Sequence, residues 1–250
     1  MRLLEKTEKN TEAFKIFMIL KINPFFYTAL TRLEMQNMVD DEILKLFAQA
    51  EILMYGLGST NNSTAYNLCK HTENKEVFKK ELMKLMKNVA IGSYTNMQEA
   101  IEDMADNNYG WNKYFHYLFL TYRSQMSKMD TADFWNLIDT KNKTYSLTIE
   151  HIIPQNAVEH SLDKYGFKDE DDFRLLKDTF GNLLALEGTP NKEASDAGLA
   201  KKQDKYKKSK VAYNRAFASS ANFLDFNKQS IKEQNEKFTS WAKEFFNDFI

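Results

Sequence analysis

The chain has 250 residues, of which 43% are hydrophobic and 28% charged, a composition that indicates a globular protein and excludes an intrinsically disordered one. The formal net charge is only -1, so any argument for a nucleic-acid partner has to come from local clusters of charge. A single cysteine, Cys69, excludes an intrachain disulfide framework and favours a cytoplasmic location, and no apolar run reaches the roughly 18–20 residues that span a bilayer, so we expect no membrane partner.

Helical spacing of apolar residues dominates the first half of the chain. Glycine and proline are few, at 8 and 3 residues, which also favours helices over a turn-rich β-sandwich. Asp40 or Asp41 is a plausible N-cap for a helix that ends near Gly56 and Gly58. Further helices are predicted at residues 8–22, 25–36, 63–69, 75–89, 96–105, 111–126 and 131–138. The chain therefore begins with an irregular helical region.

The pattern changes after residue 139. Residues 145–149 alternate like a β-strand, and Pro154 ends the strand because it has no N–H for a ladder. A second apolar run follows at residues 180–186, and residues 191–208 have a helical pattern. We therefore expect a mainly α protein in which a ββα unit is embedded in helices. A long amphipathic helix over residues 226–249, with Asn227 or Ser230 as its N-cap, completes the chain.

The predicted ββα unit contains a set of polar residues suited to phosphodiester hydrolysis. Glu150 and His151 are neighbours near the end of the first strand, and Asn182 and Asn191 follow nine positions apart. Hydrolysis needs an activated water, a cation at the scissile phosphate and relief of charge on the leaving oxygen. A histidine is a suitable base at neutral pH, and carboxylate and amide oxygens are hard donors that suit Mg²⁺.

The geometry of a strand sets a condition on this site. Successive residues of a strand point to opposite faces, so Glu150 and His151 share a face only if the strand ends or kinks there. Ile152-Ile153-Pro154 makes such a kink plausible. Asn182, on the paired strand, could hold the imidazole in the useful tautomer, and Asn191 could bring its side-chain oxygen back to the metal.

The motifs EHIIPQ, GNLLAL and PN, at this spacing, resemble the signature of the HNH (His-Me finger) nucleases. The chain resembles still more closely the C-terminal nuclease domain of GmrSD-type modification-dependent restriction endonucleases. In that family the signature precedes a Lys-x-x-x-Tyr-x-x-Ser helix and a long terminal helix, and here Lys202, Tyr206 and Ser209 have that spacing. The resemblance covers about Asp130–Ile250, which implies a helical domain over 1–129 and an HNH-type nuclease domain over 130–250.

The resemblance implies a role for each signature residue. His151 would be the general base, Asn182 would orient it, and Glu150 and Asn191 would bind Mg²⁺ (or Mn²⁺). Glu150 stands where many HNH enzymes have Asp. The activity implied is metal-dependent hydrolysis of DNA, as the nuclease portion of a restriction or anti-phage defence protein.

The resemblance also implies a partner. In the family, an N-terminal nucleotide-hydrolysing domain precedes this kind of half, and its Asp-Gly-Gln-Gln-Arg signature is missing here. An NTPase or sensor domain outside this chain is therefore expected, and whether the chain is a fragment stays open.

A dense run of lysines follows the signature. Alone, such a run is typical of a solvated helix face, but beside a nuclease signature it is expected to follow a phosphate backbone. Two other functions stay open: an idle helical module that binds nucleic acid or docks a protein, and an RNase that uses the same site. The predicted nucleic-acid-binding residues are Lys201, Lys202, Lys205 and Lys208.

Overall fold

The computed structural model describes residues 12–91, 94–106, 112–127, 129, 131–138, 147–157, 162–188 and 197–247. It is mainly helical, with one two-stranded sheet among the described residues, which confirms the mainly α fold class. None of the described helices is both long enough and apolar enough to cross a membrane.

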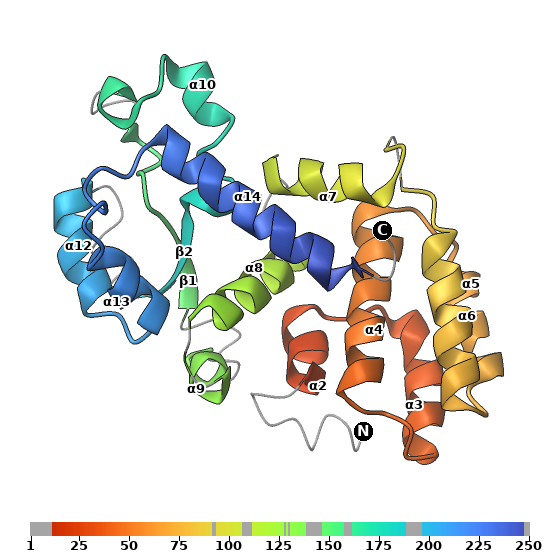
Figure 1. Cartoon of the computed structure of the whole chain (residues 1–250). Helices are drawn as coiled ribbons and strands as arrows, with labels where there is room; N and C mark the ends of the chain where they lie inside the picture. Colours follow the sequence, from red (N-terminus) through yellow and green to blue (C-terminus); the bar gives the residue numbers. More distant parts are fainter. Residues whose placement is uncertain are drawn as a thin grey trace. The chain divides into compact units, whose positions relative to one another are not determined.

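The chain divides into two compact units (Figure 1). Unit 1 comprises Met1–Ala100, Trp111–Tyr117 and Phe245–Ile250, and unit 2 comprises Ile101–Gly110 and Leu118–Glu244. The units are defined by packing, so the domain division at residues 129/130 stays a prediction.

The first part of the chain is helical throughout its described elements. In chain order these are α2 (Glu12–Phe14), the π-helical turn η1 (Lys15–Ile19), η2 (Pro24–Phe26), α3 (Tyr27–Met35), α4 (Asp41–Glu51), the π-helical turn η3 (Ile52–Leu57), α5 (Asn62–Asn67), η4 (Leu68–His71), α6 (Lys75–Lys87), α7 (Met97–Asp106), α8 (Lys113–Met126) and α9 (Thr131–Asn136).

The second part contains both strands. Its described elements are β1 (Leu147–His151), η6 (Leu162–Tyr165), α10 (Glu170–Arg174), η7 (Phe180–Asn182), β2 (Leu183–Glu187), α12 (Leu199–Lys207), α13 (Ala212–Ala218) and α14 (Lys228–Phe245). β1 extends two residues beyond the predicted strand because the ladder continues to the pair His151 and Leu183. Residues 145–146 and 191–196, which the predicted strand and helix included, lie outside the described residues.

Polar caps fix the starts of two predicted helices. Asp40 Oδ1 accepts the Ile43 N–H at 3.1 Å, so Asp40 is the N-cap of α4. At α14 both candidates take part: Asn227 Oδ1 accepts the N–H groups of Gln229 and Ser230, and Ser230 Oγ accepts the Asn227 N–H. This reciprocal arrangement satisfies N–H groups that a helix start otherwise leaves unpaired.

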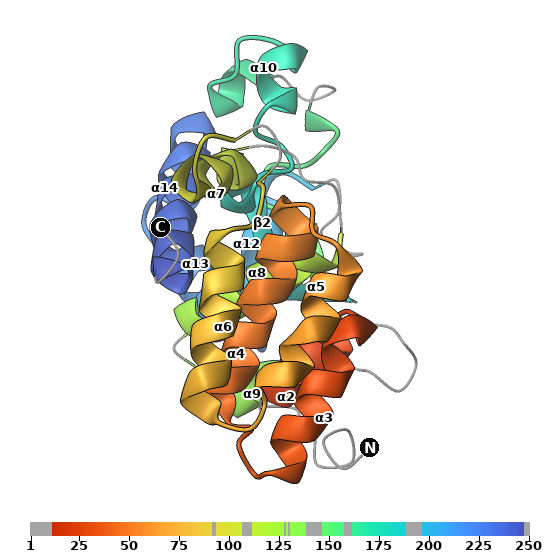
Figure 2. The same ribbon diagram turned by 90° about the vertical axis from the view of Figure 1, so that its right-hand side faces the viewer.

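Unit 1 is built around α4, which packs against α6 (Figure 2). Phe47 of α4 contacts Phe26 and Phe78, with ring centroids 5.4 Å away in each case. Glu51 at the end of α4 is fully buried, and Lys113 Nζ lies 2.6 Å from its carboxylate. The buried charge therefore has a partner, as the cost of desolvation requires.

Unit 2 is built around the antiparallel pair β1–β2, whose register runs from Leu147 opposite Glu187 to His151 opposite Leu183. The first four residues of β2 are all buried, because helices cover both faces of this strand (Figure 1). Asn214 of α13 donates to the Ala185 carbonyl. The buried Arg123 of α8 donates to the carbonyls of Phe180 and Leu183.

α14 docks on the turn that precedes β2. Phe238 stacks on Phe180, with ring centroids 3.6 Å apart. Asn235 Oδ1 accepts the Gly181 N–H at 2.6 Å. A Cβ on Gly181 would lie 2.1 Å from the Ile231 carbonyl oxygen, so only glycine permits this approach of helix and turn.

Candidate active site

The strand β1 holds Glu150 and His151, and the ladder continues through both of them. Regular alternation therefore directs their side chains to different partners. β1 ends at His151, and a bend follows at Ile152 and Ile153, where the sequence makes an end or kink of the strand plausible.

His151 pairs with a residue that sequence reasoning missed. His151 Nε2 lies 2.8 Å from Asp178 Oδ1, and Gln155 Nε2 donates to the same oxygen at 3.1 Å. The His151 side chain keeps 13% of its surface exposed, and that of Asp178 keeps 9%. The imidazole is thus near the surface, and a mostly buried carboxylate fixes its direction.

Hydrogen bonds keep Asp178 ionised. Burial alone would raise the pKa of its carboxyl group, but the hydrogen bonds from His151 and Gln155 outweigh burial and lower the pKa below its usual value. An ionised Asp178 accepts a hydrogen bond from Nε2–H, so the neutral ring carries its proton on Nε2 and its other nitrogen, Nδ1, is the acceptor.

Glu150 has a different environment, inside the protein. Only 2% of the residue is exposed, and its Oε1 accepts from Lys202 Nζ at 2.6 Å and from Tyr206 Oη at 2.8 Å. Lys202 Nζ also donates to the His151 carbonyl. Burial and the neighbouring carboxylate raise the pKa of Tyr206 well above its usual value, so its hydroxyl stays a donor.

The structure explains the Lys-x-x-x-Tyr-x-x-Ser spacing. Lys202 and Tyr206 lie four positions apart on one face of α12, and Ser209 follows just after the helix end. All three residues are buried. Ser209 Oγ donates to Glu187 Oε2 at 2.8 Å, at the end of β2. The motif therefore attaches the helix to both strands.

Asn182 is fully buried and supports the segment that follows His151. Its Oδ1 accepts the Ile153 N–H at 2.8 Å, and its Nδ2 donates to the carbonyls of Ile153 and Lys177 at 3.1 and 2.7 Å. All of these hydrogen bonds join the Asn182 side chain to backbone groups. Asp178, rather than Asn182 as expected, is hydrogen-bonded to the imidazole. Asn182 acts on His151 through the backbone.

The predicted lysines fall into two groups. Lys201 and Lys208 are exposed and Lys205 is half-buried, and their spacing places them on one stripe of α12. Lys202, one position along from Lys201, is fully buried and paired with Glu150. The expectation that Lys202 lies on the basic surface is therefore wrong, because the helix turns it about 100° away from that stripe.

Of the two expected metal ligands, only Glu150 lies within the described residues. Asn191 lies outside the described residues. Lys202 and Tyr206 both donate hydrogen bonds to Oε1 of Glu150. Within the described part of the chain, Oε2 of Glu150 accepts no hydrogen bond. A carboxylate oxygen without a protein partner fits a Mg²⁺ ligand, since Mg²⁺ takes few protein ligands. Among the described residues, no three His, Cys, Asp or Glu side chains gather as a metal site.

Comparison with known families identifies the chain. Residues 94–241, more than half of the chain, match the family described as GmrSD restriction endonucleases, C-terminal domain. The chain belongs to this family, which confirms the resemblance drawn from its motifs. The comparisons with curated proteins and with solved structures found no match.

Proposed function

We propose that the chain is a metal-dependent endonuclease of the HNH type that hydrolyses phosphodiester bonds of DNA. The observation that carries the proposal is the pair of His151 and Asp178 at the end of β1, in a chain of a restriction endonuclease family. In this proposal β1, β2 and α12 are the two strands and the helix of a ββα-metal unit.

His151 is the proposed general base. With the Nε2 proton directed at Asp178, Nδ1 accepts a proton from a water molecule. The water oxygen bonds to phosphorus, the bond to the leaving oxygen breaks, and that oxygen takes up a proton from solvent. The Asp178 carboxylate stabilises the imidazolium that forms, since opposite charges attract strongly where water is mostly excluded.

Glu150, through Oε2, and Asn191, as the sequence predicts, are the residues that would hold Mg²⁺ or Mn²⁺. When bound, the ion supplies positive charge to the scissile phosphate and the leaving oxygen. Lys202 and Tyr206 would hold the Glu150 carboxylate in place through Oε1. Lys201, Lys205 and Lys208 are proposed to contact phosphates of the bound DNA.

Plasmid nicking tests the proposal. Wild type, His151→Ala and a control variant are compared in Mg²⁺, in Mn²⁺ and in EDTA. The control is Leu224→Ala, a truncation of a side chain on a residue that is 54% exposed. We expect cleavage only with metal, and a loss of about 100- to 10,000-fold in His151→Ala alone.

Cleavage by His151→Ala at the wild-type rate would contradict the proposal. A parallel assay with duplex RNA separates the two substrates: faster hydrolysis of RNA would identify an RNase that uses the same base. Binding of DNA with no turnover under any metal, in wild type as in the variant, would favour the idle binding module.

A further inference from the structure

The outer face of α6, in unit 1, is strongly basic. Phe78, Leu82 and Met86 are buried, and they face the core of the unit at helical spacing. On another face Lys80, Lys84 and Lys87 are all exposed, four and three positions apart. The net charge of the whole chain is -1, so this concentration of positive charge is local.

An open groove of about 600 Å³ follows this face. Its lining contains four lysines, Lys79, Lys80, Lys84 and Lys87, against one acidic residue, Glu76. Asn88 adds an amide, and Met83 is the one apolar side chain in the lining. Such a lining does not suit an apolar helix or peptide, whose burial would remove lysine side chains from water without a partner.

The lysines differ in what already neutralises them. Lys79 lies 2.5 Å from Glu42 and Lys84 lies 3.7 Å from Glu81. Lys80 and Lys87 form no ion pair with any described residue. Lys84 and Lys87 lie in the last turn of α6, where a positive charge interacts favourably with the helix dipole. This interaction does not explain the position of Lys80 or the lysines along the groove.

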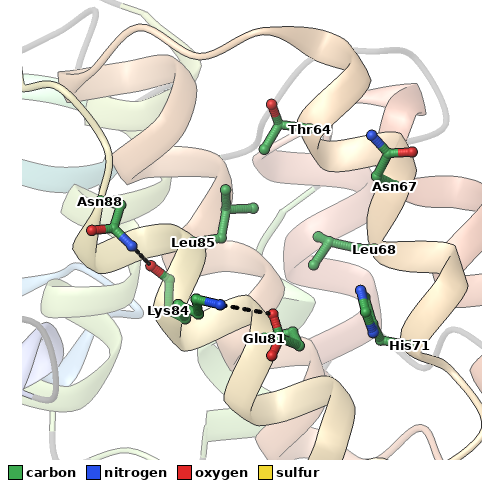
Figure 3. A pocket seen from close by; sticks show the side chains of 8 residues that line it. All are labelled: Thr64, Asn67, Leu68, His71, Glu81, Lys84, Leu85 and Asn88. Carbon is green, nitrogen blue, oxygen red and sulfur yellow. Dashed lines mark hydrogen bonds and ion pairs between the residues drawn. The ribbon is translucent and has the colours of Figure 1, made fainter.

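A smaller pocket of about 230 Å³ opens between α6 and the pair α5–η4, and it shares Lys84 and Asn88 with the groove (Figure 3). From α5 and η4 the lining includes Thr64, Asn67, Leu68 and His71, and from α6 it includes Glu81 and Leu85. Glu81 is the ion-pair partner of Lys84 (Figure 3). Hydroxyl, amide and imidazole groups next to a lysine are the side chains that commonly contact phosphate and sugar.

We propose that the groove and the pocket form a second DNA-binding surface, distinct from the hydrolytic site, which takes the sugar–phosphate backbone of duplex DNA. This inference rests on the proposed function for its choice of polyanion. The helical rise places Lys80 and Lys84 about 6 Å apart along the axis and Lys84 and Lys87 about 4.5 Å apart. Duplex DNA carries a charge on each strand about every 3.4 Å, so each of the three lysines can meet a phosphate.

The test measures equilibrium binding of the full chain to a fluorescent 30-base-pair DNA duplex in EDTA, over a series of salt concentrations. The test variant carries Lys80→Gln, Lys84→Gln and Lys87→Gln. The matched control carries Lys168→Gln, Lys232→Gln and Lys237→Gln, three exposed lysines elsewhere, and it has the same net charge. Thermal unfolding checks that both variants stay folded.

We expect the test variant to bind at least about tenfold more weakly near 0.1 M salt, and its slope of log K against log salt to fall by about 2–3. The control should change both quantities much less. In Asn67→Ala we expect weaker binding with an unchanged slope, since a neutral donor releases no counterion.

Equal losses in the test and control variants, or no loss in the test variant, would overturn the inference, and so would tighter lysine-dependent binding of duplex RNA than of DNA. Unchanged binding by Asn67→Ala would remove the pocket from the surface. Because binding is measured without metal, the outcome is independent of cleavage. His151-dependent nicking with unaffected binding by the test variant would refute only this inference, and lysine-dependent binding without any nicking would refute only the proposed function.

Discussion

Two neighbours on β1 have opposite environments. Glu150 is enclosed by Lys202 and Tyr206 and is 2% exposed, whereas the side chain of His151 pairs with Asp178 and keeps 13% of its surface in contact with solvent. Both side chains are paired with a charged group, but the side chain of His151 is the more exposed of the two. Two neighbours in the sequence, Glu150 and His151, therefore differ in burial because each faces a different part of the unit.

The difference follows from what each side of β1 faces. Glu150 faces α12, whose Lys202 and Tyr206 come from a buried stripe, so the strand and the helix are joined by a buried ion pair. His151 faces Asp178, which lies just before η7, and Gln155, which follows β1, donates to the same carboxylate. One side of the strand carries a buried ion pair, and the other carries an imidazole near the surface.

The largest effect is expected from breaking the buried pair. In Lys202→Met the Glu150 carboxylate would stay buried without its cation, so we expect a loss of about 3–5 kcal/mol in the free energy of unfolding. Urea unfolding measures it. Lys201→Met, one position away and exposed, should stay within about 0.5 kcal/mol.

Equal losses in the two lysine variants would mean that the comparison between buried and exposed stripes is wrong. Adding Glu150→Gln to Lys202→Met should recover part of the lost stability, because the charge that needs a partner is then gone.

The next largest effect is expected from the contact between α14 and the turn before β2. Gly181→Ala would place a Cβ 2.1 Å from the Ile231 carbonyl oxygen, so helix and turn must separate, at a cost of roughly 1–3 kcal/mol. The matched control is Gly198→Ala, where nothing lies within 4 Å of the added Cβ. Thermal unfolding of both variants checks the difference. A larger loss in the control would refute the close approach.

Asp178→Asn tests whether the partner of His151 contributes to the proposed reaction. The amide cannot stabilise the imidazolium, so we expect kcat for nicking to fall by about 10- to 100-fold, with little change in KM. The control is Asp171→Asn, whose side chain is 93% exposed. An unchanged kcat in Asp178→Asn would show that the pair does not take part in the reaction.

Asp178→Asn should also change how the free energy of unfolding depends on pH in acid. The pKa of Asp178 is lowered in the folded protein below the usual 3.8, so its carboxylate contributes stability that is present above pH 3.8 and is lost as the pH falls through the folded pKa. Asp178→Asn should therefore lose less stability than wild type as the pH falls below 3.8. Urea unfolding between pH 5 and 2 measures this difference.

The smallest effect on stability is expected from the outer stripe of α12. Replacing Lys201, Lys205 and Lys208 together with glutamine should change the free energy of unfolding by no more than about 0.5 kcal/mol per residue. The salt dependence of DNA binding should fall, by about one unit of slope for each phosphate that the variant no longer binds. A large destabilisation would mean that these lysines resemble Lys202.

Much of the fold was predictable because local signals are strong. The cap at Asp40, the change to strands after residue 139 and the long helix α14 all follow from capping and periodicity. The ordered motifs also predicted the family correctly.

The features that sequence reasoning missed depend on register and on distant packing. Asp178 could be recognised as the partner of His151 only with the pairing of His151 and Leu183 known, since that pairing brings the residues before β2 next to the end of β1. The burial of Lys202 was accessible from helical spacing, because residues 202, 206 and 209 form a stripe distinct from 201, 205 and 208. The prediction treated the lysines as one dense run along the sequence, so it did not separate the two stripes.

The docking of α14 has a consequence for protein synthesis. The turn before β2 is held by Asn235 and Phe238, which the ribosome adds more than fifty residues after Gly181. When His151 and Asp178 have just been synthesised, the growing chain therefore still lacks α14, the helix that holds the turn next to them. Under the proposed function, a chain whose synthesis stops before α14 would carry His151 and Asp178 without the contacts that hold the turn before β2.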